Sequence, residues 1–445
     1  MKIKKISLTN FRCFEMIDVD FDSRLTVLIA RNGAGKSTVL DAIALALGPF
    51  LSRLPGVSGI NPKKTDFRID ETGKQPAYMR ISCQSFCGIS WDRTERRDQS
   101  KSTLQSVPPA LGLKALNEYV DQFTDAHNED RDYTLPVFIY YGTGRGVFDV
   151  PARKRNFSKN FTRFEALEEA LESKTNFRRF VQYFYDLEEK ENRLHKEKRS
   201  FDIELPELKA IRRAVNRLMP QFSNIRTAEP AGIMVDWEQS PERDDEQAKK
   251  VKKSLKIEQL SDGYRTTLAM VMDIAARLAE ANPDAKDPLD VQGIILIDEV
   301  DLHLHPAWQR EFLPRLINVF PSMQFIVSTH SPFIIQSVKE GKLIDFDLDD
   351  IEQTPSLKQE KSIEDIAEDV MGIDKVQRSA LFNEQVRVSD RYYALLNSGK
   401  TEDDAEVAAL SRKLDELEEF FGDNPAWVAL LKAERRKKLK AKDGQ

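Results

Sequence analysis

Three patterns in this sequence of 445 residues predict an α/β fold. A short β-branched run, Leu25 to Ile29, leads into the glycine-rich segment Ala30 to Thr38, and residues 38–47 then place apolar side chains at helical spacing. A second apolar run, residues 293–297, ends at two adjacent carboxylates, and a third, residues 323–328, ends close to a histidine. Strand, glycine-rich turn and helix, in that order, form the context that a phosphate-binding loop requires.

The glycine-rich segment has the composition of such a loop. Backbone N–H groups converge on phosphate where glycine lets the chain turn tightly, and the positive end of the next helix adds to the attraction. We expect Lys36 to reach the β- and γ-phosphates of ATP and Ser37 to bind Mg²⁺. Ala30 stands where the usual pattern has its first glycine, so the match is one residue short. The residues expected at the nucleotide are Asn32, Gly33, Ala34, Gly35, Lys36, Ser37 and Thr38.

The carboxylates Asp298 and Glu299 follow four apolar residues. A buried strand ending there places Asp298 near Mg²⁺ and Glu299 near the γ-phosphate, where Glu299 activates a water molecule. A core strand with an acidic end is the plain structural alternative. We expect His330, after the third apolar run, to bond the γ-phosphate and report its presence. His303 and His305 between them are more typical of packing or of contact with an opposing subunit than of a metal pair.

The segment Leu260-Ser261-Asp262-Gly263-Tyr264 opens a helical pattern. Ser261 and the N–H groups near Gly263 can hold a γ-phosphate only if another subunit presents it. This segment therefore predicts that two copies of the chain close face to face, as a dimer or a higher even oligomer.

Composition excludes several classes of protein. The net charge of −6 gives no global basic field for nucleic acid. Three cysteines form no disulfide framework or zinc pattern, which favours a reducing compartment. The first residues lack the apolar core of a signal peptide, and no apolar run is long enough to span a membrane. We expect a cytoplasmic protein without membrane contact.

Further elements follow from local composition. Residues 77–91 and 135–141 are typical of strands, and residues 92–134 are polar and rich in turn residues. Residues 161–220 are charged and helical without sustained heptads, which predicts a short helical lobe instead of a long coiled-coil arm. Residues 238–256 are almost wholly charged and predict a mobile linker.

Taken together, these motifs and the run Leu8 to Phe14 resemble the RecF/SMC/OLD-like branch of ABC ATPases, over roughly residues 1–345. The resemblance implies an ABC-type P-loop head that hydrolyses ATP with Mg²⁺. It places Arg12, which follows Asn-Phe, near the nucleotide, although a structural turn arginine fits the same position. It also implies a glutamine ligand for Mg²⁺, for which Gln84, at the end of an expected strand, is our choice.

The C-terminal residues narrow the resemblance. Ser362 to Ile366, Val370 to Gly372, and Asp423 to Trp427 are similar to the ATPase (PtuA) of Septu-type antiphage systems, including retron-linked ones. Those ATPases act with an HNH-type nuclease, and the retron-linked ones also with a reverse transcriptase and its nucleic acid. No nuclease motif of the chain's own is convincing. The resemblance therefore implies an ATPase subunit of a defence complex.

The predicted organisation has four parts: the N-terminal part of the head (1–160), an inserted helical lobe (161–237), the C-terminal part of the head (238–345), and a helical partner-binding region with a basic tail (346–445). The basic tail either contacts DNA phosphates or is a solvated terminus. A RecF/SMC-like repair or recombination clamp, acting on DNA without a toxic partner, remains the alternative function.

Overall fold

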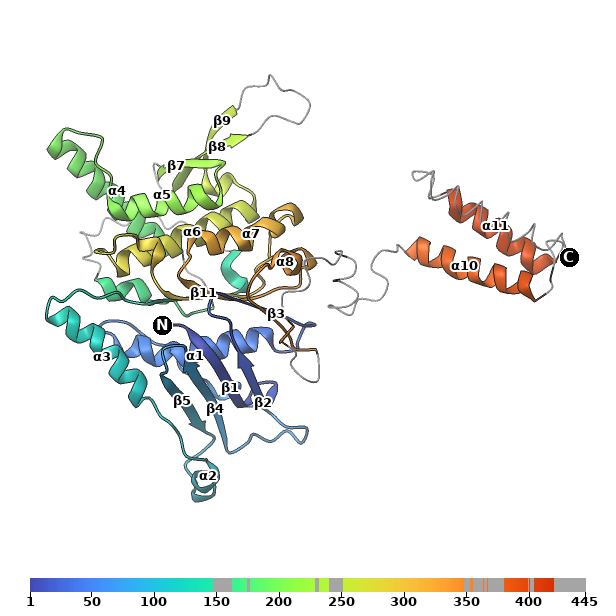
Figure 1. Cartoon of the computed structure of the whole chain (residues 1–445), viewed down its shortest axis with the longest axis horizontal. Helices are drawn as coiled ribbons and strands as arrows, with labels where there is room; N and C mark the ends of the chain where they lie inside the picture. Colours follow the sequence, from blue (N-terminus) through green and yellow to red (C-terminus); the bar gives the residue numbers. More distant parts are fainter. Residues whose placement is uncertain are drawn as a thin grey trace. The chain divides into compact units, whose positions relative to one another are not determined.

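The computed structural model describes two compact units of the chain, Met1–Ile366 and Ala367–Gln445 (Figure 1). The residues described are 1–146, 162–173, 177–228, 232–239, 251–347, 353–354, 363, 366, 380–398, 400 and 404–419. The predicted tail motifs from Val370 to Gly372 and from Asp423 to Trp427, and the basic tail, lie outside them.

A six-stranded sheet forms the centre of the first unit. Its order is β13-β12-β3-β11-β10-β6, and all neighbours are parallel except the short β13. Its strands are β3 (Leu25–Ile29), β6 (Val137–Tyr141), β10 (Gly293–Ile297), β11 (Met323–Ser328), β12 (Lys342–Asp345) and β13 (Gln353–Thr354). Every residue of β3, β6, β10 and β11 is buried, as expected for strands covered by helices on both faces. The predicted α/β fold is confirmed.

A second, antiparallel sheet has the order β2-β1-β4-β5. Its strands are β1 (Ile3–Phe11), β2 (Phe14–Asp20), β4 (Tyr78–Ser85) and β5 (Ser90–Arg96). Ile3, Ile6 and Leu8 of β1 are fully buried. The β1–β2 hairpin turns at Arg12 and Cys13, which places its tip beside the phosphate loop.

Helix α1 (Lys36–Arg53) lies between these two sheets (Figure 1). It runs past the predicted end at Leu47 and through Gly48-Pro49. Proline cannot donate to the carbonyl of Leu45 four residues back. Arg93 of β5 donates to that carbonyl instead (2.7 Å), so the helix continues with its backbone acceptor satisfied.

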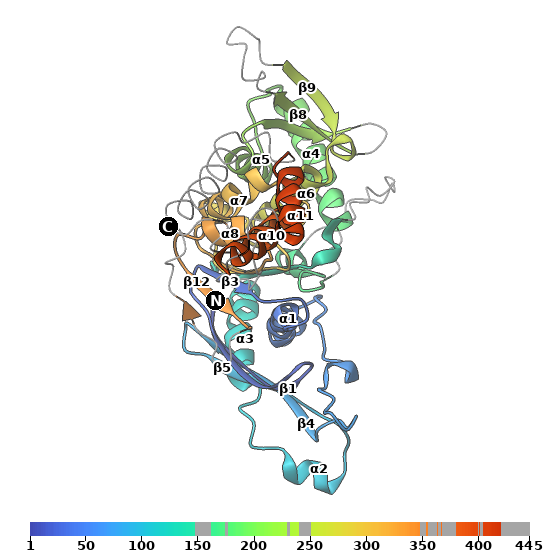
Figure 2. The same ribbon diagram turned by 90° about the vertical axis from the view of Figure 1, so that its right-hand side faces the viewer.

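Helices cover the other face of the central sheet, with a small sheet beyond them (Figure 2). The helices are α5 (Pro206–Leu218), α6 (Asp262–Ala281) and α7 (Pro306–Val319), and the small sheet is β7 (Phe222–Thr227), β8 (Ile233–Gln239) and β9 (Val251–Lys256). The expectation of a mobile linker over 238–256 is wrong for β9. This charged strand pairs with β8, and the buried Asp236 of β8 binds two of its side chains: Ser254 donates to it (2.6 Å), and Lys252 forms an ion pair with it (3.3 Å).

The remaining helices are α2 (Lys101–Ser106), α3 (Lys114–Asn128), α4 (Arg178–Lys198), α8 (Pro332–Ser337), α10 (Ala380–Asn397) and α11 (Ala405–Glu419). Helix α3 falls in the segment expected to be turns; Leu116 and Val120 bury one narrow face of an otherwise polar helix. In the second unit, α10 and α11 pack around Tyr392 and Leu414. Among the described residues, none of the helices has the length and apolar character needed to cross a bilayer.

Candidate nucleotide site

The carboxyl edge of the central sheet gathers the residues that the sequence singled out. Leu28 of β3 pairs with Ser328 of β11, and Val327 pairs with Ile297 of β10. β11 therefore lies between the phosphate loop, which follows β3, and Asp298, which follows β10. Ligands of parallel α/β sheets bind at this edge.

The phosphate loop folds around the side chain of Lys36. Its ammonium donates to the carbonyls of Ala30 (2.7 Å) and Arg31 (3.1 Å), and the residue is only 6% exposed. Burial lowers the pKa of Lys36, whereas the carboxylates of Asp347, Asp298, Glu299 and Asp301 act in the opposite direction. Nearby negative charges favour the charged form of a buried ammonium. A multiply charged phosphate would add such charges, so this position suits phosphate binding.

Two glycines of the loop differ in what surrounds them. Gly33 and Gly35 both have positive φ (86° and 105°). A Cβ atom on Gly33 would meet nothing within 4 Å, whereas one on Gly35 would lie 2.3 Å from the Phe14 ring and 2.9 Å from the Cys13 sulfur. The tip of the β1–β2 hairpin therefore packs directly on the loop. Asn32, Gly33 and Ser37 stay exposed, which leaves that side of the loop open to a ligand.

The two adjacent carboxylates have different surroundings. Asp298 is buried, and its Oδ1 accepts a hydrogen bond from the Ser328 hydroxyl (2.5 Å). The same hydroxyl accepts from the backbone N–H of Glu299 (2.7 Å). Glu299 has a φ of 48°, a left-handed conformation that is strained for a glutamate. Its side chain is half-buried and, within the described residues, makes no hydrogen bond, so its carboxylate is available to a substrate.

The segment after Glu299 is tied to the residues around His330. Thr329 donates to Asp301 Oδ1 (2.5 Å), which also accepts from the backbone N–H of His330 (3.3 Å). The His330 imidazole is half-buried and has no hydrogen-bond partner in the part of the chain that the structure describes. His305 caps α7 through its Nδ1, which accepts from Ala307 (3.3 Å).

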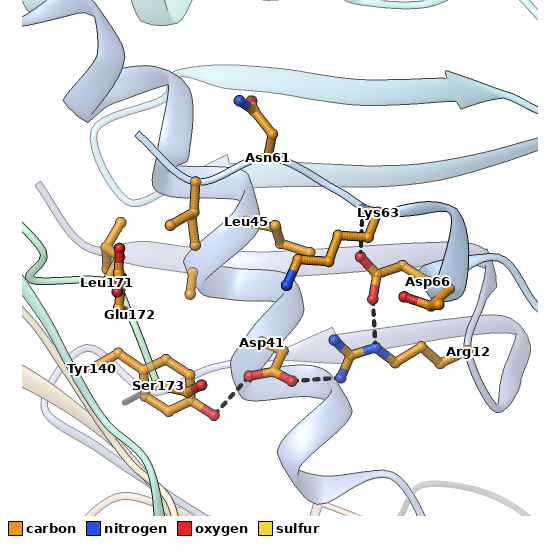
Figure 3. Close-up of a pocket in the computed structure, with 13 residues that line it drawn as sticks. Arg12, Asp41, Leu45, Asn61, Lys63, Asp66, Tyr140, Leu171, Glu172 and Ser173 are labelled. Carbon is orange, nitrogen blue, oxygen red and sulfur yellow. Dashed lines mark hydrogen bonds and ion pairs between the residues drawn. The ribbon is translucent and has the colours of Figure 1, made fainter. Parts of the chain in front are cut away.

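Arg12 belongs to a chain of charged groups beside α1 (Figure 3). Its guanidinium donates to Asp41 (2.5 Å) and Asp66 (2.9 Å), and Tyr140 donates its hydroxyl proton to the other oxygen of Asp41 (2.8 Å). Burial raises the pKa of Tyr140, and the Asp41 carboxylate raises it further. These residues line a pocket of about 520 Å³, into which Lys63 also extends. Arg12 is thus near the phosphate loop, but its guanidinium is bonded to Asp41 and Asp66.

Ser261 and Gly263 lie on the other side of the sheet, at the start of α6. Ser261 is exposed as the N-cap residue, and within the described residues no hydrogen bond connects it to the phosphate loop. A Cβ on Gly263 would lie 2.3 Å from the His303 carbonyl, so this glycine lets α6 approach the segment that follows Glu299. Tyr264 packs edge-on against Phe222 and Trp308.

Gln84 is not part of this site, which corrects its assignment as a magnesium ligand. It is exposed on β4 and pairs with Lys5, at the end of β1 remote from the hairpin tip. The prediction rested on the position of Gln84 at the end of a strand. That strand, β4, belongs to the antiparallel sheet, so its end is not at the carboxyl edge of the central sheet.

Three residues at the site were missed: Arg145, Ser328 and Asp347. The carboxylate of Asp347, after β12, accepts from the backbone N–H of Arg31 (2.6 Å). Only the position of Ser328 directly before Thr329-His330 marked it in the sequence. Arg145 and Asp347 carry no motif, because contacts between distant segments create their roles.

Comparison with known proteins identifies the family. A model of an AAA domain matches residues 5–223, and an AAA-domain model described with the AbiEii toxin of type IV toxin–antitoxin systems matches residues 148–336. The retron Ec83 probable ATPase of Escherichia coli is 30% identical over 406 residues, covering 76% of this chain and 70% of that protein. Septu protein PtuA of Bacillus thuringiensis is 32% identical over 140 residues, covering 29% of this chain and 35% of that protein.

Among solved structures, the SMC head bound to the C-terminal winged-helix domain of ScpA aligns with a TM-score of 0.40 and 15% identity, covering 78% of this chain and 94% of that one. The sequence relatives confirm the predicted resemblance to retron and Septu ATPases. The chain belongs to the AAA-domain ATPase family of the retron Ec83 ATPase and is an enzyme that hydrolyses ATP.

Proposed function

We propose that this ATPase is a switch in which two heads close face to face on ATP. One observation carries the proposal: the phosphate loop and both carboxylates share one sheet edge, whereas Ser261 is exposed at the start of α6 and, among the described residues, makes no hydrogen bond to the phosphate loop. Ser261 makes no side-chain capping bond to this helix, and the N–H groups of the first turn of a helix attract phosphate. A second copy of the chain would present its nucleotide to it.

Within one head, the chain's own residues bind and orient the substrate. Lys36 exchanges its loop carbonyls for phosphate oxygens, and the N–H groups from Gly33 to Thr38 surround the phosphates. Glu299 accepts a proton from the attacking water, and His330 bonds the γ-phosphate. The exposed Ser37 hydroxyl and the buried Asp298 carboxylate are hard oxygen donors that fit Mg²⁺, which when bound neutralises phosphate charge.

At the level of the cell, we propose that the chain acts in antiphage defence and holds an HNH-type nuclease under the control of its nucleotide state. The similarity to a retron ATPase and to a Septu protein supports this role. Residues 346–445, which include the α10–α11 pair, would form the region that binds the partner. A reverse transcriptase with its nucleic acid is a further partner of the same complex.

Mixing two inactive variants tests whether heads share sites. Lys36→Ala removes nucleotide binding, and Ser261→Arg blocks the start of α6; each variant alone should lose ATP hydrolysis. A mixed dimer contains one site with an intact loop and an intact opposing Ser261, so mixing should restore part of the activity. Equal inactivity of the mixture at all ratios would exclude shared sites.

Purification from the native locus with ATP and magnesium tests the cellular role. A stoichiometric HNH-type nuclease in the purified complex, identified by mass spectrometry, is the expected result. Recovery of the chain alone, or with DNA only, would instead support the DNA-repair clamp. Full phage protection by the chain without a partner would contradict the proposed control of a nuclease.

A further inference from the structure

Arg145 is a buried arginine at the carboxylate end of the site. It lies in the short 3₁₀ turn Thr143–Gly146, directly after β6, and is only 2% exposed. Its Nη1 donates to the backbone carbonyls of Asp298 (2.5 Å) and Gly142 (3.0 Å), and its Nη2 donates to the carbonyl of Glu299 (2.5 Å). One guanidinium therefore binds the carbonyls of both acidic residues.

These two carbonyls belong to the turn that aims Glu299. β10 stays in register with β6 as far as Asp298, whose N–H donates to the Tyr141 carbonyl (2.8 Å). The chain then leaves the sheet because Glu299 adopts a left-handed conformation (φ 48°). A strained conformation persists only where its surroundings over-determine it. Ser328 holds the N–H side of this turn, and Arg145 holds its carbonyl side.

The charge of Arg145 suits the same position. Burial lowers the pKa of Arg145, and the nearby carboxylates of Asp298, Asp301 and Glu299 act against that shift. Arginine keeps its charge even when buried and presents its donors as a rigid planar fork. Lysine has the charge but not the fork, so it cannot bind two successive carbonyls in the same way.

We propose that Arg145 is a positioning residue for hydrolysis: its guanidinium clamps the left-handed turn at Glu299 and so directs the Glu299 carboxylate toward the attacking water. The inference rests on the proposed role of Glu299 as the general base. It adds a residue from the turn after β6, a segment to which the sequence assigned no chemistry.

The test compares Arg145→Ala, Arg145→Lys, Glu299→Gln and the double variant Arg145→Ala/Glu299→Gln. For Arg145→Ala we expect kcat to fall about 10- to 100-fold, in the range seen when groups that orient catalytic ligands are removed, with KM and the Kd for ATP little changed. Arg145→Ala should therefore retain unhydrolysed ATP through gel filtration, as we also expect for Glu299→Gln. Arg145→Lys should regain only part of the rate.

The double variant separates positioning from general damage. If Arg145 acts through Glu299, the double variant is no slower than Glu299→Gln in single-turnover hydrolysis. Multiplicative losses, or a weaker Kd for ATP in both Arg145 variants, would overturn the proposal. Because Arg145→Lys keeps the charge and most of the volume, it provides the same comparison if Arg145→Ala does not fold.

Arg163 offers a matched control. It also lies in a 3₁₀ turn and donates to two backbone carbonyls, those of Ala281 (2.9 Å) and Tyr133 (2.8 Å), but Tyr133 precedes the amino end of β6, whereas the carboxylate turn lies at the opposite end of the neighbouring strand β10. Arg163→Ala should lower the melting temperature and leave kcat unchanged. Wild-type hydrolysis by Glu299→Gln would refute the proposed role of Glu299 as the general base, whereas slow Glu299→Gln with fast Arg145→Ala would refute only the inference about Arg145.

Discussion

The phosphate loop and the carboxylate turn lie on the same sheet edge but are built in opposite ways. The loop is assembled from nine consecutive residues, and Lys36 bonds to carbonyls only five and six positions away. The turn at Asp298 and Glu299 depends on Arg145, which precedes it by more than 150 residues, and on Ser328, which follows on another strand. One half of the site is local, and the other exists only once three strands have paired.

The largest expected effect is a loss of ATP affinity on substitution of Gly35, the loop residue that packs against the hairpin tip. Gly35→Ala forces a Cβ against Phe14 at 2.3 Å and also strains a φ of 105°. We expect ATP affinity to fall by more than about 100-fold, equivalent to about 2.7 kcal/mol. Titration calorimetry with ATP measures the change, and circular dichroism verifies the fold.

Gly33→Ala is the matched comparison within the same loop. It shares the positive φ of 86° but meets nothing within 4 Å, so only the conformational strain of about 1–2 kcal/mol applies. Its loss of affinity should be about tenfold. Equal losses in the two variants would show that backbone conformation, and not the hairpin tip, controls the loop.

The next effect is on the carboxylate turn. Ser328→Ala removes the hydroxyl that donates to Asp298 and accepts from the Glu299 N–H. We expect about a 10-fold fall in kcat and a higher magnesium requirement, as for other groups that orient metal ligands. Hydrolysis measured against magnesium concentration shows both changes.

Ser85→Ala is the control for this variant. Ser85 is equally buried, and its hydroxyl also donates one hydrogen bond and accepts another, but its partners are the backbone carbonyl and N–H of Ile89 in the β4–β5 turn. It should lower stability without changing the magnesium requirement. If both variants behave alike, Ser328 serves the fold and not the carboxylates.

The same contrast explains what could be predicted from the sequence. Strands β10 and β11 were placed correctly because uninterrupted apolar runs are typical of buried parallel strands. Helix α3 was missed because it buries only a narrow face, and the end of α1 was missed because Gly48-Pro49 normally stops a helix. There, Arg93 compensates for the missing N–H, and a contact from another sheet leaves no local pattern.

For the site, the residues at the phosphate loop carry a motif because one short segment forms the whole structure. Asp298 and Glu299 were recognisable because a strand delivers them. Gln84 was misplaced because the sequence did not reveal which sheet its strand joins. Arg145 and Asp347 were invisible because each acts on backbone atoms of a segment far away in the sequence.

A smaller effect, a gain of ATP affinity, is expected when the charge of Asp347 beside the loop is removed. The Asp347 carboxylate bonds to the Arg31 N–H (2.6 Å) and lies within electrostatic range of Lys36. Its negative charge opposes the approach of phosphate. Asp347→Asn keeps an acceptor for Arg31 and removes that charge, so ATP affinity should rise several-fold at low salt. A fall in affinity would instead show that Asp347 helps to form the bound loop.

The smallest effect tests β6, the strand that pairs with β10 beside the carboxylate turn. Tyr140 and Tyr141 point to opposite faces of β6, as consecutive strand residues do. The first donates to Asp41 of α1, and the second to the buried Asp273 of α6 (2.7 Å). Asp273 keeps its bonds to Arg277, so Tyr141→Phe should cost about 1.5–3 kcal/mol of unfolding free energy, the usual value for a hydrogen bond to a charged group. Urea denaturation measures that cost. If the folded variant also hydrolyses ATP more slowly than the wild type, Tyr141 couples α6, the helix that begins after Ser261, to the carboxylate turn. The carboxylate side of the site would then include α6 as well as the three strands that build it.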